Sequence, residues 1–316
     1  MVRSQPSSSS DARIGVVGAS GFVGSAVVAK LQRQHSCTVV KIAAPRVEWR
    51  NEGPEHLLVT ERLSISDLAS EFAELDAVVN CAGFAIASSR NASELWNANC
   101  ATAAVFAAAA RTAGIPRVVH ISSAAVQGRS DVLDSSSLVK PENSYGDSKA
   151  CGEEMVRALC PGAVVYRPPG VHGSDRDVTR RLVRLAGSRL SSVAAPGDGN
   201  APQALIENVA SAIAFLLMVS AEPPSVVSHP SEGLSTAELL ELIGGRVPRE
   251  VPRGMARMLL SLGFGLPFKS DWMYAQLRRL EVLWFGQVQA SSWLTEAGWQ
   301  PDIDKAGWSN FQRYLE

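Results

Sequence analysis

Short apolar, β-branched runs alternate with longer segments of helical spacing through the first half of the chain. These runs predict strands at 13–18, 38–42, 56–59, 76–81, 117–122 and 163–167. The segments between them predict helices at 22–34, 67–75, 98–113 and 145–159. The third helix is rich in alanine, and Gly114 follows it as a C-cap residue. Such alternation predicts parallel strands joined by crossover helices, which is a doubly wound α/β sheet.

A glycine-rich loop stands between the first predicted strand and the first helix. Its G-x-x-G-x-x-G pattern supplies the residues expected to contact a cofactor: Gly18, Ser20, Gly21, Phe22, Val23 and Gly24. In this setting the first glycine permits a tight turn, the second lets the backbone approach a pyrophosphate, and the third lets helix pack on strand. The helix N-terminus adds free N–H groups and the positive end of its dipole. The loop therefore predicts a Rossmann-type sheet that binds a dinucleotide.

The choice between NAD and NADP depends on the end of the second predicted strand. An acidic residue that holds the adenosine ribose is expected there, about 20 residues after the loop. Ala43 and Ala44 stand at that distance, and Arg46 is the next charged side chain. Because an arginine can accommodate the 2′-phosphate of NADP, the sequence favours NADP and leaves NAD open.

The pattern changes after Pro168. Proline and glycine become frequent, helical segments dominate, and strand candidates are short. Ligands of doubly wound sheets bind at the carboxyl ends of the strands, so a smaller lobe is expected at that edge. The predicted organisation is a flexible leader at 1–12, a dinucleotide-binding domain at 13–167 and a smaller, mostly helical substrate lobe at 168–316, with some segments returning to the sheet.

Composition narrows the classes of protein. The chain is 46% hydrophobic and 19% charged, with a formal net charge of −1, so it can form a full core and has no basic field for nucleic acid. Its longest apolar stretches, at 101–110 and 209–219, are shorter than the roughly 20 residues of a membrane span. The N-terminus has no apolar signal segment. We expect a cytoplasmic protein with no membrane span and no nucleic-acid partner.

The cysteines are odd in number and scattered, at Cys37, Cys81, Cys100, Cys151 and Cys160. None forms a C-x-x-C pair. This spacing favours neither a disulfide framework nor a zinc site, and it fits a reducing compartment. No metal is expected.

Candidate catalytic side chains occur in the fourth predicted helix and the strand before it. Tyr145 and Lys149 are four residues apart, hence on one helix face. A free phenol has a pKa near 10, and a neighbouring ammonium group is expected to lower it toward the range useful for base catalysis. Ser122 and Ser123 end the fifth predicted strand, where a hydroxyl can reach a substrate oxygen. The pattern indicates proton exchange at a substrate hydroxyl.

Together with the glycine loop, these residues resemble the short-chain dehydrogenases/reductases in their extended, epimerase/dehydratase branch, from about residue 12 to the C-terminus. The segment 80–83 (NCAG) is similar to the loop that runs along the cofactor, through Cys81, Ala82 and Gly83. The segment 120–128 (HISSAAVQG) resembles the serine segment, and 166–173 (YRPPGVHG) resembles the segment beside the nicotinamide carboxamide, with Pro168 in contact. The segments 205–210 and 234–239 resemble landmarks of sugar-nucleotide enzymes.

The resemblance implies a role for each catalytic candidate. Tyr145 would exchange the proton of a substrate hydroxyl while a hydride moves to or from the nicotinamide. Ser123 would hydrogen-bond that oxygen, and Lys149 would tune Tyr145 and hold the nicotinamide ribose. Asn99 matches the asparagine that the family carries on a helix. The resemblance also implies a homodimer formed through helices of the dinucleotide-binding domain.

Three departures from the family pattern bear on the substrate. Ala124 and Ala125 replace the Asp-Glu pair of the 4,6-dehydratases, which argues against dehydration. Gln127 replaces a tyrosine of the serine segment and alters the pocket wall. Ala201 stands where an arginine grips the nucleotide diphosphate, so the nucleotide part of the substrate then depends on another arginine, with Arg180, Arg184 and Arg278 as candidates.

The leading hypothesis is an NAD(P)-dependent epimerase or ketoreductase that acts on a secondary alcohol or ketone of a sugar, specifically a nucleotide sugar. The first alternative is an NADPH-dependent reductase of a non-nucleotide ketone or aldehyde. The second is a non-catalytic NADP-binding sensor or scaffold on the same fold, which would have no need of the Ser123, Tyr145 and Lys149 set.

Overall fold

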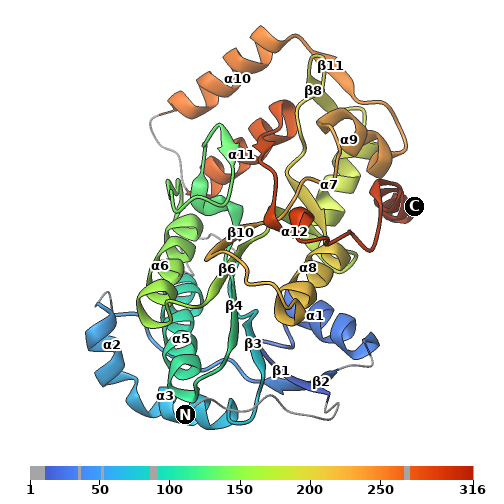
Figure 1. The fold of residues 1–316 in the computed structure, drawn as a ribbon. Coiled ribbons are helices and arrows are strands. Elements are labelled where there is room, and N and C mark those ends of the chain that lie inside the picture. The colour runs from blue at the N-terminus through green and yellow to red at the C-terminus, as the bar shows by residue number, and fades with distance from the viewer. Residues whose placement is uncertain (1–10, 35–36, 51–52, 86–91, 267–270, 316) are drawn as a thin grey trace.

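The computed structural model describes residues 11–34, 37–50, 53–85, 92–266 and 271–315. A six-stranded, wholly parallel sheet lies at its centre, with the strand order β10-β6-β4-β3-β1-β2 (Figure 1). The strands are β1 (Ala12–Val17), β2 (Cys37–Ile42), β3 (Ala77–Asn80), β4 (Arg117–Ile121), β6 (Val164–Arg167) and β10 (Val226–Ser228). The predicted doubly wound α/β sheet is thus confirmed.

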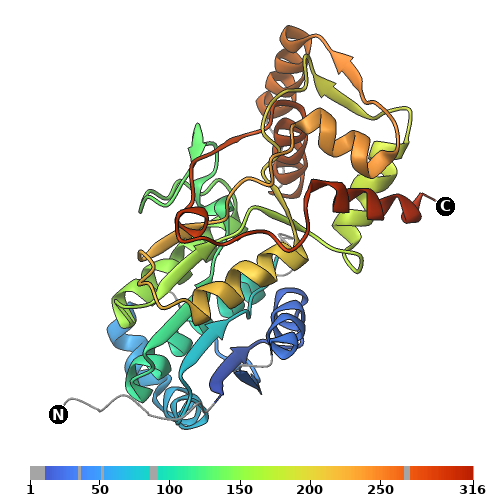
Figure 2. The ribbon, with the colours of Figure 1, turned by 45° about the vertical axis from the view of Figure 1, so that its right-hand side comes forward.

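Helices cover both faces of the sheet, as Figures 1 and 2 show. On one face lie α3 (Arg62–Glu71), α5 (Thr102–Ala113) and α6 (Ser144–Leu159), and on the other lie α1 (Phe22–Arg33) and α8 (Ile206–Met218). Because the side chains of α5 are mostly alanine and buried, this helix packs closely against both α3 and α6. The central strands are buried on both sides, which explains their continuous apolar sequences.

Two local predictions need correction. The strand expected at 56–59 is wrong: these residues belong to helix α2 (Pro54–Thr60), where a proline in the first turn starts the helix and Leu57 alone is buried. The helix expected at 98–113 begins after the short helix α4 (Ala92–Trp96) with a π-helical turn, η1 (Asn97–Ala101), before α5. It ends as predicted, at Gly114 in the left-handed region with φ +66°.

The C-terminal part of the chain lies over the carboxyl ends of the sheet strands (Figures 1 and 2). Two small parallel sheets pair β7 (Gly170–His172) with β9 (Gln203–Leu205) and β8 (Ser192–Ala194) with β11 (Arg249–Val251). Around them are α7 (Asp177–Gly187), α9 (Thr236–Gly244), α10 (Arg253–Gly265), α11 (Asp271–Phe285) and the 3₁₀ segment η3 (Lys305–Tyr314). From the same stretch of chain, β10 joins the central sheet and α8 packs against it.

Short elements connect the two parts. The 3₁₀ turn η2 (Ala124–Gln127) follows β4, and β5 (Val132–Leu133) pairs with β12 (Val288–Gln289) from near the C-terminus. The short helix α12 (Trp293–Glu296) packs near β10. Segments far apart in the sequence therefore meet just above the carboxyl edge of the sheet.

The cysteine spacing favoured no disulfide framework, but one pair of cysteines does form a disulfide. Cys100 in η1 and Cys151 in α6 are 51 positions apart and form a disulfide, whereas Cys37, Cys81 and Cys160 are free. Sequence spacing did not indicate this bond because it depends on the close packing of two helices. In the described ranges, no helix is both long and apolar enough to cross a membrane, and no group of side chains forms a metal site.

Candidate functional site

The glycine loop forms a tight turn between β1 and α1. Gly18 has a φ of +76°, and its N–H donates to the carbonyl of Ile42 at 3.1 Å. A Cβ at Gly18 would stand 2.7 Å from the Ala82 nitrogen, and one at Gly24 would overlap the Gly18 carbonyl. Only glycine fits at these two positions, because one needs a left-handed backbone and both have backbone against them.

The start of α1 is suited to a phosphate. Gly21 is the N-cap residue and supplies no side-chain cap, and the first turn contains no acidic residue. Ser20 and Gly21 are exposed at the tip of the loop, while Phe22 and Val23 are half-buried. The first N–H groups of α1 are therefore free of side-chain caps and stand at the positive end of the helix dipole.

The loop after β3 runs beside the glycine loop. The Cys81 N–H donates to the Val17 carbonyl at 2.9 Å, and the Ala82 N–H donates to Asn80 Oδ1 at 3.0 Å. A Cβ at Gly83 would lie 2.9 Å from Lys149 Nζ, so this loop also touches the candidate catalytic helix. Burial raises the pKa of the Cys81 thiol to about 12, which leaves it neutral and non-nucleophilic at pH 7.

Ser123 and Tyr145 meet at the carboxyl edge of the sheet. Ser123 is the N-cap of η2, and its Oγ accepts from the Ala125 N–H at 3.2 Å. Tyr145 lies in the first turn of α6, which is capped by Asn143. The Ser123 hydroxyl acts on the Tyr145 phenol and lowers its pKa, and Ser123 stands two residues after the end of β4. A hydroxyl group and a phenol therefore act on each other at this edge of the sheet.

Burial dominates the electrostatics of Tyr145 and Lys149. Burial raises the pKa of Tyr145, while the hydrogen bond from Ser123 and the charge of Arg176 act in the opposite direction. Lys149 Nζ donates to the Ile121 carbonyl at 3.0 Å, and the cation that acts on Tyr145 in this structure is Arg176. The expected effect of Lys149 on this pKa stays a prediction. Burial also lowers the pKa of Lys149 to about 8, against the opposing charge of Glu153.

Asn99 lies in the π-helical turn η1 and is fully buried. Its Oδ1 accepts from the Phe84 N–H, and its Nδ2 donates to the Phe84 carbonyl, both at 2.9 Å. Nδ2 also donates to Ser148 Oγ at 3.0 Å. Asn99 therefore joins the loop after β3 to α6 one residue before Lys149, and π-helical turns of this kind often mark functional sites.

Ser122, the other serine of the pair, is held in a buried ion network. Its Oγ donates to Glu153 Oε1 at 2.5 Å, and Arg167 binds both carboxylate oxygens of Glu153, at 2.8 and 2.7 Å. Arg167 Nη1 also donates to the Ser136 carbonyl at 2.7 Å. Of the two adjacent serines, Ser123 is the one that acts on the pKa of Tyr145, whereas Ser122 binds Glu153 of α6.

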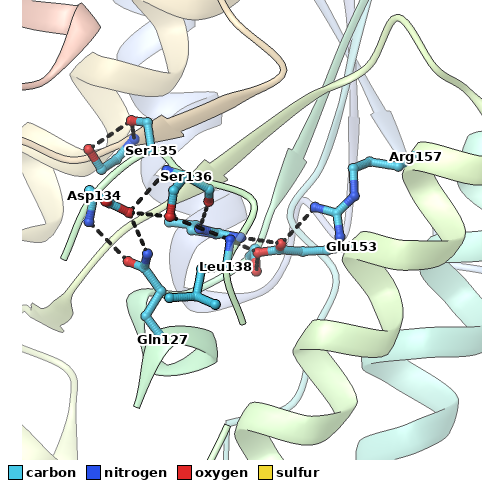
Figure 3. Close-up of polar contacts among 10 residues, drawn as sticks. Gln127, Asp134, Ser135, Ser136, Leu138, Glu153 and Arg157 are labelled. Carbon is cyan, nitrogen blue, oxygen red and sulfur yellow. Dashed lines mark hydrogen bonds and ion pairs between the residues drawn. The ribbon is translucent and has the colours of Figure 1, made fainter. Parts of the chain in front are cut away.

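Gln127 closes the other end of this network, as Figure 3 shows. Its Nε2 donates to Asp134 Oδ1 at 2.7 Å, and its Oε1 accepts from the Asp134 N–H at 3.1 Å. Asp134 Oδ1 also accepts from the Ser136 hydroxyl at 2.7 Å. Since Gln127 is 1% exposed, it fastens the 134–136 segment to the serine segment.

The remaining predicted residues differ in their surroundings. The carbonyl of Pro168 accepts from the Ala124 N–H at 2.9 Å, so Pro168 adjoins Ser123. Arg46 is exposed, after the end of the edge strand β2 and outside the cluster around Tyr145. Thus the glycine loop, Gly83, Asn99 and the Ser123–Tyr145–Lys149 set lie together, and Arg46 stands apart.

Sequence reasoning missed Arg176, whose charge reaches Tyr145. It is the N-cap residue of α7 and stacks over the Phe22 ring at 4.7 Å. No motif marks this position. The signal that could have found it is the segment 166–173, which leads directly into it at the edge of the site.

Comparison with solved structures shows the same fold in a reductase, an epimerase and an epimerase family protein. A dTDP-4-dehydrorhamnose reductase from Clostridium acetobutylicum is 16% identical, with a TM-score of 0.62 over 96% of this chain and 98% of that chain. UDP-glucuronic acid 4-epimerase from Bacillus cereus, in complex with NAD, is 17% identical, with a TM-score of 0.62 over 96% and 99%. The human epimerase family protein SDR39U1, with NADPH, is 18% identical, with a TM-score of 0.65 over 95% and 99%.

Sequence comparison gives a family but no close relative. Compared with curated proteins, the sequence has no match. The model of the NAD dependent epimerase/dehydratase family matches residues 14–226, from β1 to the start of β10. Because this match spans most of the chain and includes the glycine loop, Asn99, Ser123, Tyr145 and Lys149, the protein belongs to the NAD-dependent epimerase/dehydratase family.

Proposed function

We propose that the protein is an NAD(P)-dependent oxidoreductase or epimerase that acts on a secondary alcohol or ketone of a sugar nucleotide. The observation that carries this proposal is the cluster of Ser123, Tyr145 and Lys149 at the carboxyl edge of the sheet, next to the uncapped start of α1. Two enzymes with the same fold are named for dTDP- and UDP-linked sugars. Their names support a sugar nucleotide as the substrate class of this chain.

The residues present fit a nicotinamide dinucleotide. The glycine loop leaves room for a pyrophosphate on the α1 N-terminus, and Gly83, where a Cβ would meet Lys149 and Asn99, keeps the path toward Tyr145 open. When bound, the nicotinamide accepts or supplies the hydride. Arg46, in place of a ribose-binding carboxylate, favours NADP at the adenosine end, and NAD stays possible.

The side chains of the protein would then bind the substrate oxygen and transfer its proton. Ser123 Oγ donates a hydrogen bond to that oxygen, and Tyr145 Oη gives or takes its proton, depending on the direction of the reaction. The buried ammonium group of Lys149 would favour the phenolate form once a substrate and cofactor displace water from the site. Asn99 would hold η1 and α6 in register, so that the phenol and the ammonium keep their positions.

Within this class we propose a 4-epimerase or 4-ketoreductase. Ala124 and Ala125 carry no acid or base, so the chain lacks side chains for an elimination step at that position. An epimerase must keep its cofactor through the cycle, because the hydride returns to the opposite face of the same intermediate. A ketoreductase releases its oxidised cofactor after every turnover.

Cofactor retention separates these two reactions. The protein is purified without added dinucleotide, its absorbance spectrum is recorded, and UDP-hexoses are offered. We expect bound cofactor and interconversion of 4-epimers without net oxidation of NADPH. A cofactor-free protein that oxidises NADPH stoichiometrically with a keto sugar nucleotide would instead establish the ketoreductase.

Replacing the phenol tests the proposed proton route. Tyr145→Phe should retain cofactor affinity and lose about 10²- to 10⁴-fold in kcat, the usual contribution of general acid–base catalysis. Cofactor binding by fluorescence and turnover by product analysis are measured on the same preparation. A variant with near-normal kcat on an identified substrate would contradict the proposal.

A second candidate is an NADPH-dependent reductase of a ketone or aldehyde without a nucleotide. The observation in its favour is Ala201, which is 3% exposed and cannot contact a diphosphate as an arginine would. Turnover of simple keto sugars at rates equal to those of their nucleotide-linked forms would favour this candidate. A non-catalytic sensor would show cofactor binding and no turnover with either class.

A further inference from the structure

Arg278 on α11 contacts two segments of the candidate site from the C-terminal part of the chain. Its Nη2 donates to the Gly128 carbonyl at 3.1 Å, and its Nε lies 3.7 Å from Glu142 Oε2. Within α11, its Nη1 donates to Glu281 Oε2 at 2.7 Å. The Arg278 side chain is 17% exposed, so most of its hydrogen-bonding capacity is used inside the chain.

Gly128 is the residue through which Arg278 reaches the serine segment 120–128. It is the C-cap residue of η2, and Ser123 is the N-cap residue of the same element. The Gly128 N–H donates to the Ala125 carbonyl at 3.2 Å. Because η2 is a short 3₁₀ turn, a displacement of the Gly128 carbonyl also displaces the other end of the turn, where the Ser123 hydroxyl stands.

Glu142 is the residue through which Arg278 reaches the start of α6. The next residue, Asn143, is the N-cap of α6, and its Oδ1 accepts from the Gly146 N–H at 2.9 Å. Tyr145 lies within this capped turn. One guanidinium group therefore contacts both of the segments that carry the candidate hydroxyl groups.

The two segments are also joined directly to each other. The Lys140 N–H donates to the Val126 carbonyl at 2.8 Å. A Cβ at Gly128, where φ is +54°, would overlap the Lys140 carbonyl. Because backbone meets backbone at this contact, a displacement of one segment displaces the other.

Gln287, which follows α11, supports the contact at Gly128. Its Oε1 accepts from Arg278 Nη2 at 2.9 Å. Its Nε2 donates to the carbonyls of Gly128 at 3.0 Å and Ser130 at 2.7 Å. A carbonyl oxygen has two lone pairs, so Arg278 and Gln287 can both bind the Gly128 oxygen. This carbonyl is therefore held by two side chains from the C-terminal part of the chain.

Arg129 completes the charges around Arg278. Its Nε lies 3.7 Å from Glu142 Oε1 and donates to Glu281 Oε2 at 3.0 Å. Each of the two carboxylates thus lies between the same two guanidinium groups. Since opposite charges alternate in this cluster, its two positive and two negative charges are balanced inside the chain.

We infer that Arg278 is a positioning residue, which aligns the Ser123 hydroxyl with the Tyr145 phenol by binding both of the segments that carry them. The inference rests on the proposed function and deepens it, because it names a residue outside the reacting groups on which their alignment depends. The sequence alone offered Arg278 as a candidate for contact with the substrate diphosphate, whereas its donors bind Gly128 and Glu281. Alignment matters because a misplacement of about 1 Å can cost about 10²-fold in rate.

The test replaces Arg278 by methionine, which keeps an unbranched side chain and removes the charge and the hydrogen bonds. Arg278→Met should lower kcat about 10- to 100-fold and leave KM and the affinities for UDP, NAD and NADP within about twofold. Arg278→Lys keeps the charge beside Glu142 and should recover part of the lost kcat. Arg257→Met makes the same exchange at an exposed arginine of α10 and should leave kcat unchanged.

Gln287→Ala reaches the same carbonyl by a second route. It should also lower kcat without changing KM. In the double variant with Arg278→Met, the two losses should multiply to less than their product, because both side chains act on Gly128. Backbone hydrogen exchange in Arg278→Met should be faster in peptides that cover 123–130 and 142–147, and unchanged in the glycine loop.

A lower kcat, faster exchange in both segments and unchanged UDP affinity would together support the inference. A clear loss of UDP affinity in Arg278→Met would overturn it, because Arg278 would then bind the substrate phosphates. Faster exchange with a normal kcat would overturn it as well, since the contacts would then serve stability alone. If the wild type turns over no sugar nucleotide and no simple ketone, the proposed function fails separately. The exchange measurement then decides whether Arg278 holds the two segments, and unchanged exchange would show that it does not.

Discussion

His172 shows how one buried residue makes the fold sensitive to acid. It is 5% exposed, with Nε2 and Gln203 Oε1 2.9 Å apart and Nδ1 and Thr179 Oγ1 3.2 Å apart. Burial lowers its pKa to about 4, and the charges of Arg176 and Arg279 contribute in the same direction. A histidine that stays neutral in the folded protein but is protonated in the unfolded chain lowers stability as the pH falls.

This residue gives a prediction with a defined sign. Above its unfolded pKa near 6.5, His172 is neutral in both states and has no effect on the pH dependence. Between pH 6.5 and 4 the unfolded state takes up the proton first, so about 2 kcal/mol of stability should be lost by pH 5. Urea unfolding of wild type and His172→Gln at pH 7 and pH 5 measures this. Equal pH slopes for the two proteins would contradict it.

Arg46 carries the prediction on cofactor choice. Its guanidinium group can contact the 2′-phosphate that only NADP has, so Arg46→Ala should weaken NADP and leave NAD nearly unchanged. We expect about a tenfold loss for NADP, measured by fluorescence titration. Arg50→Ala, which removes an exposed arginine from the same segment, is the matched control. Equal effects on NAD and NADP would show that Arg46 has no part in the choice.

At the scale of elements, the contact between α6 and η1 leaves no spare room. A Cβ added to Gly152 would overlap the Asn99 carbonyl, which is backbone and cannot turn away. Gly152→Ala should therefore push α6 from η1, displace Lys149 and Tyr145, lower the melting temperature and reduce kcat. Gly162→Ala adds the same methyl group where nothing lies within 4 Å and should be tolerated. Equal melting temperatures for the two variants would rule out this packing argument.

Elements whose signal is local were predictable from the sequence. Buried parallel strands have continuous apolar runs, and the turn at Gly18 and Gly24 needs glycine for steric reasons, so β1, the loop and α1 follow from the chain itself. The prediction at 56–59 is wrong because the apolar residues there have the pattern of a short strand. Pro54 starts a helix in this region, and Leu57 is its buried residue. The three-residue strand β10 could not be seen, since its place depends on pairing with β6.

The candidate site likewise contains residues that a local sequence pattern indicates and residues that it does not. Ser123, Tyr145 and Lys149 have a spacing that the sequence itself displays, and their joint role stays a prediction. The position of Arg176 depends on how α7 lies over the strand ends, which no local pattern encodes. The roles of Ser122 and Ser123 likewise differ only in three dimensions, where Glu153 accepts a hydrogen bond from Ser122 and Ser123 lowers the pKa of Tyr145.

At the scale of the whole molecule, the candidate site lies between two parts that depend on each other. The division at residue 168 stays a prediction, and the chain beyond it supplies α8 and β10 to the sheet. In return, the Gln127–Asp134 and Arg167–Glu153 contacts fix the segment above the strands to α6 (Figure 3). Homodimer formation through helices of the first part also stays a prediction.

The disulfide makes stability depend on the redox state of the surroundings. Cys100 and Cys151 join η1 to α6, the two elements that carry Asn99 and the Tyr145–Lys149 pair. A cross-link stabilises mainly by restricting the unfolded chain, typically by about 2–4 kcal/mol. Under reducing conditions the pair would be present as two thiols. The oxidised protein should then be the more stable form.

Reduction should lower the melting temperature of the wild type. The double variant Cys100→Ala/Cys151→Ala should melt close to the temperature of the reduced wild type, and reductant should not change its melting temperature. Cys37→Ser changes a free cysteine and should keep the full response to reductant, which makes it the control. Differential scanning calorimetry with and without dithiothreitol measures the shifts, and mass spectrometry after alkylation counts the thiols. The wild type could melt at the same temperature with and without dithiothreitol, even where alkylation confirms that the disulfide is broken. That result would mean that the packing of Gly152 against Asn99 holds η1 and α6 together and that the disulfide adds no stability.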